Sequence, residues 1–401
     1  MRAYLVTYAF IVISASAASI PAGTEVHVRL LTEVSSNKPS GQIVRAAVTA
    51  PVFLNGAPVI SARTELVGKT ADAHTAATAD QGGEQPATLR INFSTIENSS
   101  GPGKPLSCVV ESIDNARETV DQTGLIVGIT PSQTIEARID QGIGKLSARN
   151  SEFGQLLSGI ETAMVKKVDP EIDYQPGVDL VLKLTQPLDW APTAAAQSSV
   201  AAIEPSDALV RVVNGEPFRT VAESPPKPSD MTNLMFIGTE EQIQQAFRDA
   251  GWSASERLSE NSKIETARAI IESRGYNEAP MSILLLDGRP PDLTFQKQNN
   301  TFAKRHHIRV WRRPDTFNGK PVWVAAATHD TGITFSQQSK TFTHGIDPDI
   351  DNERSKVVND LLFTNDAHAL ALVDRSSIPK DASNATGDKL ITDGKMAVLE
   401  F

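Results

Sequence analysis

A strand-like segment, RHHIRVWRR from Arg305 to Arg313, concentrates side chains that could do chemistry. Successive side chains of a strand point to opposite faces, so the basic and aromatic residues share one face, made of Arg305, His307, Arg309, Trp311 and Arg313. Arginine offers a planar fork of donors to phosphate or carboxylate, and a histidine between arginines can carry a proton. The pattern predicts an anion-binding face, with His306 turned to the core on the other side.

A second motif follows after thirty residues and adds carboxylates. The stretch THGIDPDID begins at Thr343, and Arg354 comes shortly after it. We predict a ligand-binding set composed of Arg305, His307, Arg309, Trp311, His344, Asp347, Asp349, Asp351 and Arg354. Asp349 and Asp351 also suit the start of a helix, where negative charge is favourable.

Three interpretations of this set stay open. The arginines could pair with Asp347, Asp349, Asp351 and Glu353 as a purely structural network. A metal could bind the aspartates together with His307, His329 and His344, although neighbouring arginines would repel it. The protein could instead hydrolyse phosphoesters, with His307, His344 and Asp330 as candidate catalytic residues. Catalysis predicts that these candidates converge in a cleft open to solvent, whereas a binding or structural role predicts direct Arg–Asp pairs.

Composition narrows the class of protein. The 401 residues carry a formal net charge of -10, which argues against nucleic acid as a partner. We expect no cofactor, and as a partner either an anionic small molecule or another envelope protein. Cys108 is the single cysteine, so an intramolecular disulfide is excluded; its apolar neighbours predict a buried strand.

The N-terminus has the features of an export signal. Arg2 precedes a short apolar run, and small residues at Ala15 to Ala17 suit a signal peptidase. We expect residues 1–17 to be a signal peptide and the protein to be periplasmic or secreted. The apolar run is too short to span a bilayer, so any membrane proximity would not involve a spanning helix.

Residues 20–190 predict a small β-barrel. The strand ending at Leu30 alternates apolar and polar residues, and the strand ending at Leu184 repeats its plan, with a weaker copy at 59–68. Such repeated sequence patterns are typical of a barrel in which pseudo-equivalent strands pair. Further strands are expected at 43–52, 88–96, 106–113 and 125–129, and one helix at 153–168. A Pro/Ala/Ser-rich linker at 191–230 follows, in which 209–218 could form a hairpin around Asn214-Gly215.

Residues 231–365 predict an α+β domain with a mainly antiparallel sheet. A buried strand at 233–238 leads into a capping box at Thr239 and a helix that stops at Gly251. A second helix at 263–274 and strands at 281–286, 292–297, 305–312 and 321–328 come next. A last helix starts near Asp349, and residues 366–401 form a tail that is partly disordered or adds an edge strand.

Many separated motifs of this domain resemble the LssY C-terminal family of bacterial envelope proteins, sometimes fused to membrane phosphatase domains. They include Ala250-Gly251-Trp252, the strand from Arg305, His329-Asp330 and the stretch from Thr343 to Arg354. The opening PAGTEV, the APVF segment at Ala50 and PGVDL at Pro176 resemble the TrbI-like barrel of conjugation channels. Together the resemblances imply a non-enzymatic envelope protein with a scaffold barrel and a binding domain, with the hydrolase as the alternative.

Overall fold

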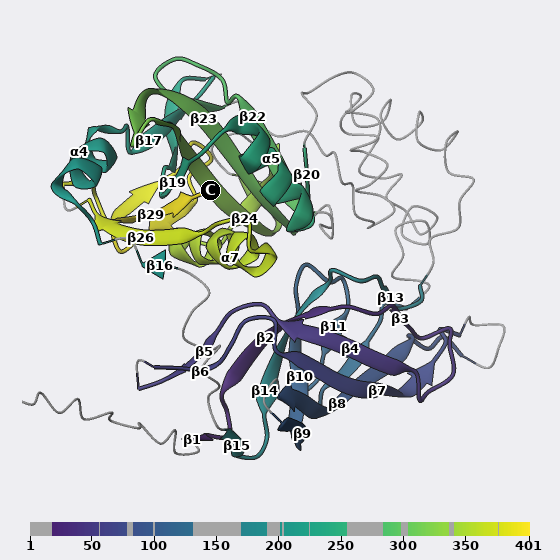
Figure 1. Cartoon of the computed structure of the whole chain (residues 1–401). Helices are drawn as coiled ribbons and strands as arrows, with labels where there is room; N and C mark the ends of the chain where they lie inside the picture. Colours follow the sequence, from purple (N-terminus) through teal and green to yellow (C-terminus); the bar gives the residue numbers. More distant parts are fainter. Residues whose placement is uncertain are drawn as a thin grey trace, which may run out of the picture.

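A computed structural model describes two domains, one stacked on the other (Figure 1). The described residues are 18–55, 57–77, 83–98, 101–130, 170–190, 201–202, 204–223, 225–254, 284–297, 304–336, 341–375 and 377–401. Outside them lie the predicted signal peptide, the helices expected at 153–168 and 263–274, and residues 191–200 of the Pro/Ala/Ser-rich linker. Within the described residues, no helix is long and apolar enough to cross a membrane.

The N-terminal domain is a nearly closed barrel. Its sheet is composed of β2 (Glu25–Leu30), β4 (Ile43–Val48), β7 (Glu65–His74), β8 (Thr88–Asn98), β9 (Gly101–Pro105), β10 (Cys108–Ile113), β11 (Thr119–Val120), β12 (Leu125–Val127) and β14 (Asp179–Leu184). The order runs β10-β14-β2-β4-β7-β8-β12-β11, with β9 beside β8. Because β10 also contacts β8 and β11, the sheet closes on itself.

The two strands that share a repeated sequence pattern are neighbours in this barrel. Strands β2 and β14 pair antiparallel, with Arg29 opposite Asp179, which confirms that pseudo-equivalent strands pair. Alternate side chains of β14 fill the core, as the alternating sequence predicts. Three short pairs complete the domain: β1 (Ala18–Ile20) with β15 (Leu188–Trp190), β3 (Val34–Ser35) with β13 (Asp173–Tyr174), and β5 (Val52–Leu54) with β6 (Ala57–Ile60).

The C-terminal domain is built on a second large, mainly antiparallel sheet. Its strands are β16 (Ala201–Ala202), β19 (Leu234–Ile237), β20 (Trp252–Ala254), β22 (Leu293–Lys297), β23 (Arg305–Phe317), β24 (Lys320–Ser336), β25 (Thr341–Ile346), β26 (Ala369–Asp374) and β29 (Lys395–Glu400). The order is β16-β26-β29-β19-β24-β23-β22-β20, with β25 beside β24. The tail expected at 366–401 thus supplies β29, which lies inside the sheet beside β19 and not at its edge.

Both faces of this sheet are covered. Helices α5 (Glu240–Asp249) and α7 (Ile350–Thr364) pack over one face, in a core with Phe236, Trp252 and Ile308. Helix α4 (Asp207–Gly215) and a small sheet cover the other, where Trp311 is buried. That small sheet contains β17 (Arg219–Ala222), β18 (Lys227–Met231) and β21 (Leu284–Leu285); a last hairpin joins β27 (Asp381–Ser383) to β28 (Lys389–Ile391).

Two local expectations are corrected by these layers. The predicted hairpin at 209–218 is wrong. Ser206 caps helix α4 by accepting from the Leu209 N–H, and Asn214, the expected turn residue, lies within that helix. The face of β23 predicted to bind an anion is not exposed, since every residue from Arg305 to Trp311 is buried. Alternation of polar and apolar residues indicates a half-exposed strand only when one face of the sheet meets water.

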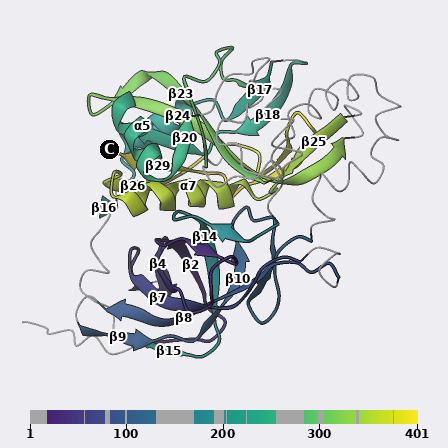
Figure 2. The ribbon, with the colours of Figure 1, turned by 90° about the vertical axis from the view of Figure 1, so that its right-hand side faces the viewer.

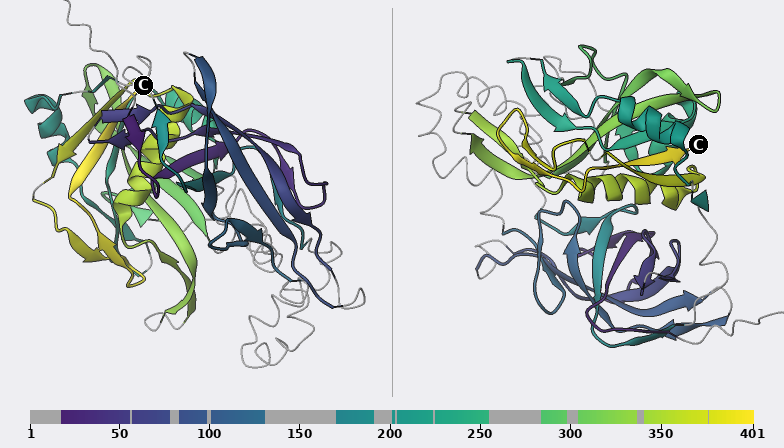
Figure 3. Two further views of the ribbon diagram at one scale, coloured as in Figure 1. Left: turned by 90° about the horizontal axis from the view of Figure 1, so that it is seen from below. Right: turned by 90° about the vertical axis from the view of Figure 1, so that its left-hand side faces the viewer.

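Helix α7 lies between the sheet and the barrel (Figure 2 and the right-hand view of Figure 3). Asp349 caps its start by accepting from the Asp351 N–H, as predicted, and Asn365 ends it in the left-handed conformation at φ 72°. Val357 and Leu361 anchor one side in the domain core. The opposite side of the helix is therefore left to face the barrel.

Candidate functional site

The predicted anion-binding arginines are engaged in buried ion pairs. Arg305 Nη2 lies 2.9 Å from Asp330 Oδ2, and Arg309 Nη1 lies 3.3 Å from Asp230 Oδ2. Arg309 is 4% exposed and Arg305 8%. Burial raises the pKa of Asp330 in spite of the facing arginine. These arginines therefore neutralise carboxylates inside the domain rather than facing solvent.

His307 joins this group, whereas Trp311 belongs to the hydrophobic core. The Thr328 hydroxyl lies 2.7 Å from His307 Nε2, and His307 Nδ1 lies 3.9 Å from Asp330. Trp311 Nε1 donates to the Arg289 carbonyl at 3.1 Å. The structure thus brings His307 and Asp330, two of the three catalytic candidates, to one place, and buries both.

The residues of the second predicted motif organise the start of α7. Asp347 accepts from the Asp349 N–H at 3.0 Å and from Asn352. Arg354 pairs with Asp351 at 3.0 Å and with Asp393 at 2.8 Å, which ties the helix to the loop before β29. His344 lies opposite Ile333 in the β24–β25 pair, and its side chain is outside what the structure describes.

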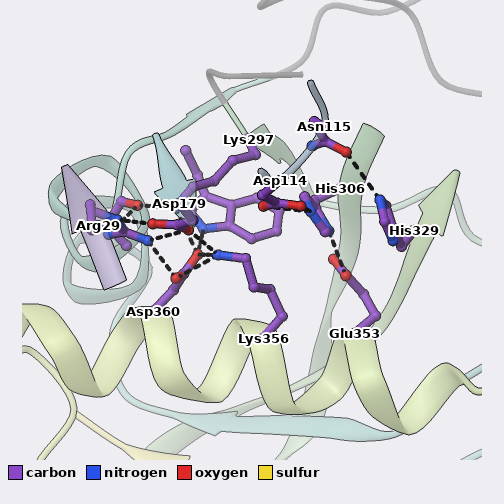
Figure 4. A network of polar contacts seen from close by, with 12 residues as sticks. Arg29, Asp114, Asn115, Asp179, Lys297, His306, His329, Glu353, Lys356 and Asp360 are labelled. Atoms are coloured by element: carbon purple, nitrogen blue, oxygen red, sulfur yellow. Dashed lines mark hydrogen bonds and ion pairs between the residues drawn. The ribbon is translucent and has the colours of Figure 1, made fainter. Parts of the chain in front are cut away.

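A charged network that the sequence analysis did not predict joins the two domains (Figure 4). Arg29 of the barrel donates to Asp179 at 2.7 Å and to Asp360 of α7 at 2.6 Å. Lys356 of α7 crosses in the other direction and donates to Asp179 at 2.6 Å. Lys297 donates to Asp360 at 2.8 Å.

Deep burial makes this network energetically demanding. Asp360 is 1% exposed, and Arg29 is buried although it belongs to the outer face of its strand. Burial opposes ionisation of Asp360, but the surrounding cations hold its pKa well below the usual range. Burial also lowers the pKa of Lys297 to about 8. A charge in such a place is tolerated only when it is paired, so the partners are needed together.

A second cluster lies beside the first and centres on His306. Its Nδ1 lies 2.7 Å from Glu353 Oε2, and its Nε2 lies 2.9 Å from Asp114 Oδ1, in the barrel loop after β10. The ring stacks on His329, its cross-strand partner, at a centroid distance of 4.0 Å. His329 Nε2 in turn contacts Asn115 Oδ1 at 3.0 Å.

Electrostatics favour the imidazolium form of His306. Burial disfavours the charged ring, but Asp114 and Glu353 outweigh it and raise its pKa to about 10. In that form the two clusters together contain four cations and four carboxylates: Arg29, Lys297, Lys356 and His306 against Asp114, Asp179, Glu353 and Asp360. These eight groups therefore carry no net charge together.

A cavity of about 220 Å³ opens between the domains at this point. Asp114, His306 and His329 line it, together with Lys356 and the exposed His27 of β2. One ligand atom from each of Asp114, His306 and His329 lies within 4.8 Å of the other two. The arrangement can hold the domains together and can offer nitrogen and oxygen donors to a cation.

One signal in the sequence could have indicated this site. Glu353, Lys356 and Asp360 follow one another at spacings of three and four, so they share one side of a helix. A charged side opposite an apolar one usually indicates solvent. The sequence does not reveal that Arg29, Asp114 and Asp179, from a separate domain, cover that side.

Comparison with known proteins supports the resemblance of the C-terminal domain. Residues 216–396 match the family described as LssY C-terminus, so this domain is LssY-like, and the match extends into the tail beyond 365. Among solved structures, ComB10 of the Com type IV secretion system of Helicobacter pylori matches at 14% identity and a TM-score of 0.23. That match covers 43% of this chain and 91% of the ComB10 chain. No curated protein matches the chain.

Proposed function

We propose that this chain, with its LssY-like C-terminal domain, is an exported, non-enzymatic scaffold protein of the bacterial envelope whose two domains act as one unit. The observation that carries the proposal is the buried network in which Arg29 and Asp179 of the barrel meet Lys356 and Asp360 of α7. Separating the domains would leave these charged side chains without their ion-pair partners. The contact is therefore typical of a permanent interface rather than a transient one.

The burial of Arg305, His307 and Arg309 in strand β23 favours a structural role for these residues over a catalytic one. Direct pairs of Arg305 with Asp330 and of Arg309 with Asp230 match the pattern expected for a structural or binding role. Because these groups and His307 are buried, we favour another envelope protein as the partner over an anionic small molecule.

Activity assays on the full chain test the non-enzymatic part. We expect no hydrolysis of p-nitrophenyl phosphate, with or without added divalent metal, and no heat of phosphate binding in calorimetry. Phosphoester turnover lost in both His307→Ala and Asp330→Asn, but kept in the exposed control His368→Ala, would establish the hydrolase instead. Phosphate binding lost in His307→Ala would favour the anionic ligand.

Export is tested through the mature N-terminus. We expect cell fractionation to place the protein in the periplasm, and mass spectrometry of the intact protein to find a chain that begins at Ala18. A cytoplasmic protein that retains residues 1–17 would contradict export.

A further inference from the structure

We propose that Asp114, His306 and His329 form a binding site for a divalent transition-metal ion, Zn²⁺ by preference, at the junction of the two domains. Two imidazoles and one carboxylate are the mixed nitrogen and oxygen donors that Zn²⁺ takes when it keeps an open coordination position. The three donor atoms lie within 4.8 Å of one another, close enough for one ion to reach all of them after small side-chain movements.

The surroundings of His306 resemble those of a metal-binding histidine. Glu353 Oε2 lies 2.7 Å from His306 Nδ1 and fixes the orientation of the ring, which leaves Nε2 directed toward Asp114. Metal-bound histidines regularly give their second ring N–H to a carboxylate in this manner. An ion between His306 Nε2 and Asp114 would take the place of the Nε2 proton, which leaves to solvent.

The backbone around the site is built to hold the donors together. His306 and His329 are direct cross-strand partners in β23 and β24, so their rings are side by side. Asp114 comes from the opposite domain, and its N–H donates to the Asp179 carbonyl at 2.9 Å, which anchors the barrel loop.

The cavity supplies the remaining coordination positions. Its volume of about 220 Å³ is enough for several water molecules, and the three donors lie in its wall. Carboxylates outnumber cations in its lining, where Asp114, Asp179, Asp347 and Glu353 are balanced only in part by Lys356 and the His306 imidazolium. A cation therefore enters a site of favourable charge from a space that water can reach.

Calorimetric titration of the full chain with ZnSO₄ tests the site directly. The protein is purified without a histidine tag and treated with a chelator first. We expect one Zn²⁺ per chain, and at least tenfold weaker binding in Asp114→Asn and in His329→Ala. Glu353→Gln should weaken binding by about 10- to 100-fold, as is usual when the carboxylate behind a metal-bound histidine is changed.

His27→Ala is the matched control, because His27 is an exposed histidine that lines the same cavity outside the donor set. Its zinc affinity should equal that of the wild type. Circular dichroism checks that each variant folds; if His329→Ala does not, Asp114→Asn, which preserves side-chain shape, decides. Absence of stoichiometric zinc in the wild type, or affinity unchanged in Asp114→Asn, would overturn the proposal.

The location of the site between domains gives a second readout. An ion bound by Asp114 and by the two histidines links the barrel to the C-terminal sheet, so it stabilises only the docked arrangement. Saturating Zn²⁺ should raise the thermal midpoint of the wild type and leave that of Asp114→Asn unchanged. An equal rise in both would also count against the site.

Discussion

Asp360 receives hydrogen bonds from four side chains, Arg29, Lys297, Lys356 and the Trp252 ring N–H. Asp360 and Asp179 together balance the three buried cations, and Arg29 and Lys356 pair with both carboxylates. We expect Asp360→Asn to lower the free energy of unfolding by about 3–5 kcal/mol, because the amide leaves those cations facing Asp179 alone. Urea denaturation measures the effect.

The control for that variant is Asp381→Asn, which removes an exposed carboxylate paired with Lys389. Exposed ion pairs contribute little, so this change should stay within about 0.5 kcal/mol of the wild type. An Asp360→Asn protein as stable as the Asp381→Asn control would mean that the buried network is not held by its charges.

Lys297 predicts a pH dependence of stability. Burial lowers its pKa to about 8 in the folded protein, against a value of 10.5 for an unperturbed lysine. Between these values the unfolded chain holds the proton that the folded one has lost, so raising the pH favours folding. Relative to Lys297→Met, which has no such titration, the wild type should gain up to about 3 kcal/mol from pH 8 to pH 10.5.

Denaturant titrations of both proteins at pH 7.5, 9 and 10.5 measure this difference. A difference that stays level over this range would contradict the prediction, because a lysine whose pKa the ion pair with Asp360 keeps at or above 10.5 holds its proton in both states. The wild type and Lys297→Met share all other titratable groups. The contributions of those groups to the pH dependence of stability therefore largely cancel when the two proteins are compared.

At the scale of elements, the barrel caps the end of α7. Arg63, at a turn with φ 67°, donates through Nε to the Phe363 carbonyl at 2.6 Å. A cation at a helix C-terminus is favourable, because the last carbonyls of a helix lack partners within it. We expect Arg63→Ala to destabilise the protein by about 1 kcal/mol in urea denaturation.

The comparison for Arg63 is Arg45→Ala, which removes another exposed barrel arginine, paired with Glu65 within its own sheet. Its loss should cost less than about 0.5 kcal/mol. If the two variants lose the same stability, the contact between the barrel and the helix end contributes nothing beyond an ordinary surface pair.

Local sequence patterns predicted the helices and strands well where contacts between residues close in the chain determine them. The capping box at Thr239 is present with both of its hydrogen bonds, and Asp349 caps α7 as its position suggested. The hairpin predicted at Asn214 failed, because Ser206 outside that window starts a helix. Turn residues indicate a turn only when no cap upstream competes with them.

At the scale of the whole molecule, the candidate site depends on contacts between residues far apart in the chain. His306 was expected to face the core, where it is buried and has two carboxylate partners. One partner, Asp114, belongs to the other domain, and no periodicity within a strand indicates it. The Arg29–Asp360 contact was beyond prediction for the same reason.

The central claim, that the barrel and the LssY-like domain form one structural unit, is tested most directly by differential scanning calorimetry of the full mature chain. A single cooperative transition is expected for the wild type, because the buried charges of each domain need the other. In Asp360→Asn the same scan should divide into two transitions. Two independent transitions in the wild type, unmoved by Asp360→Asn, would contradict the claim.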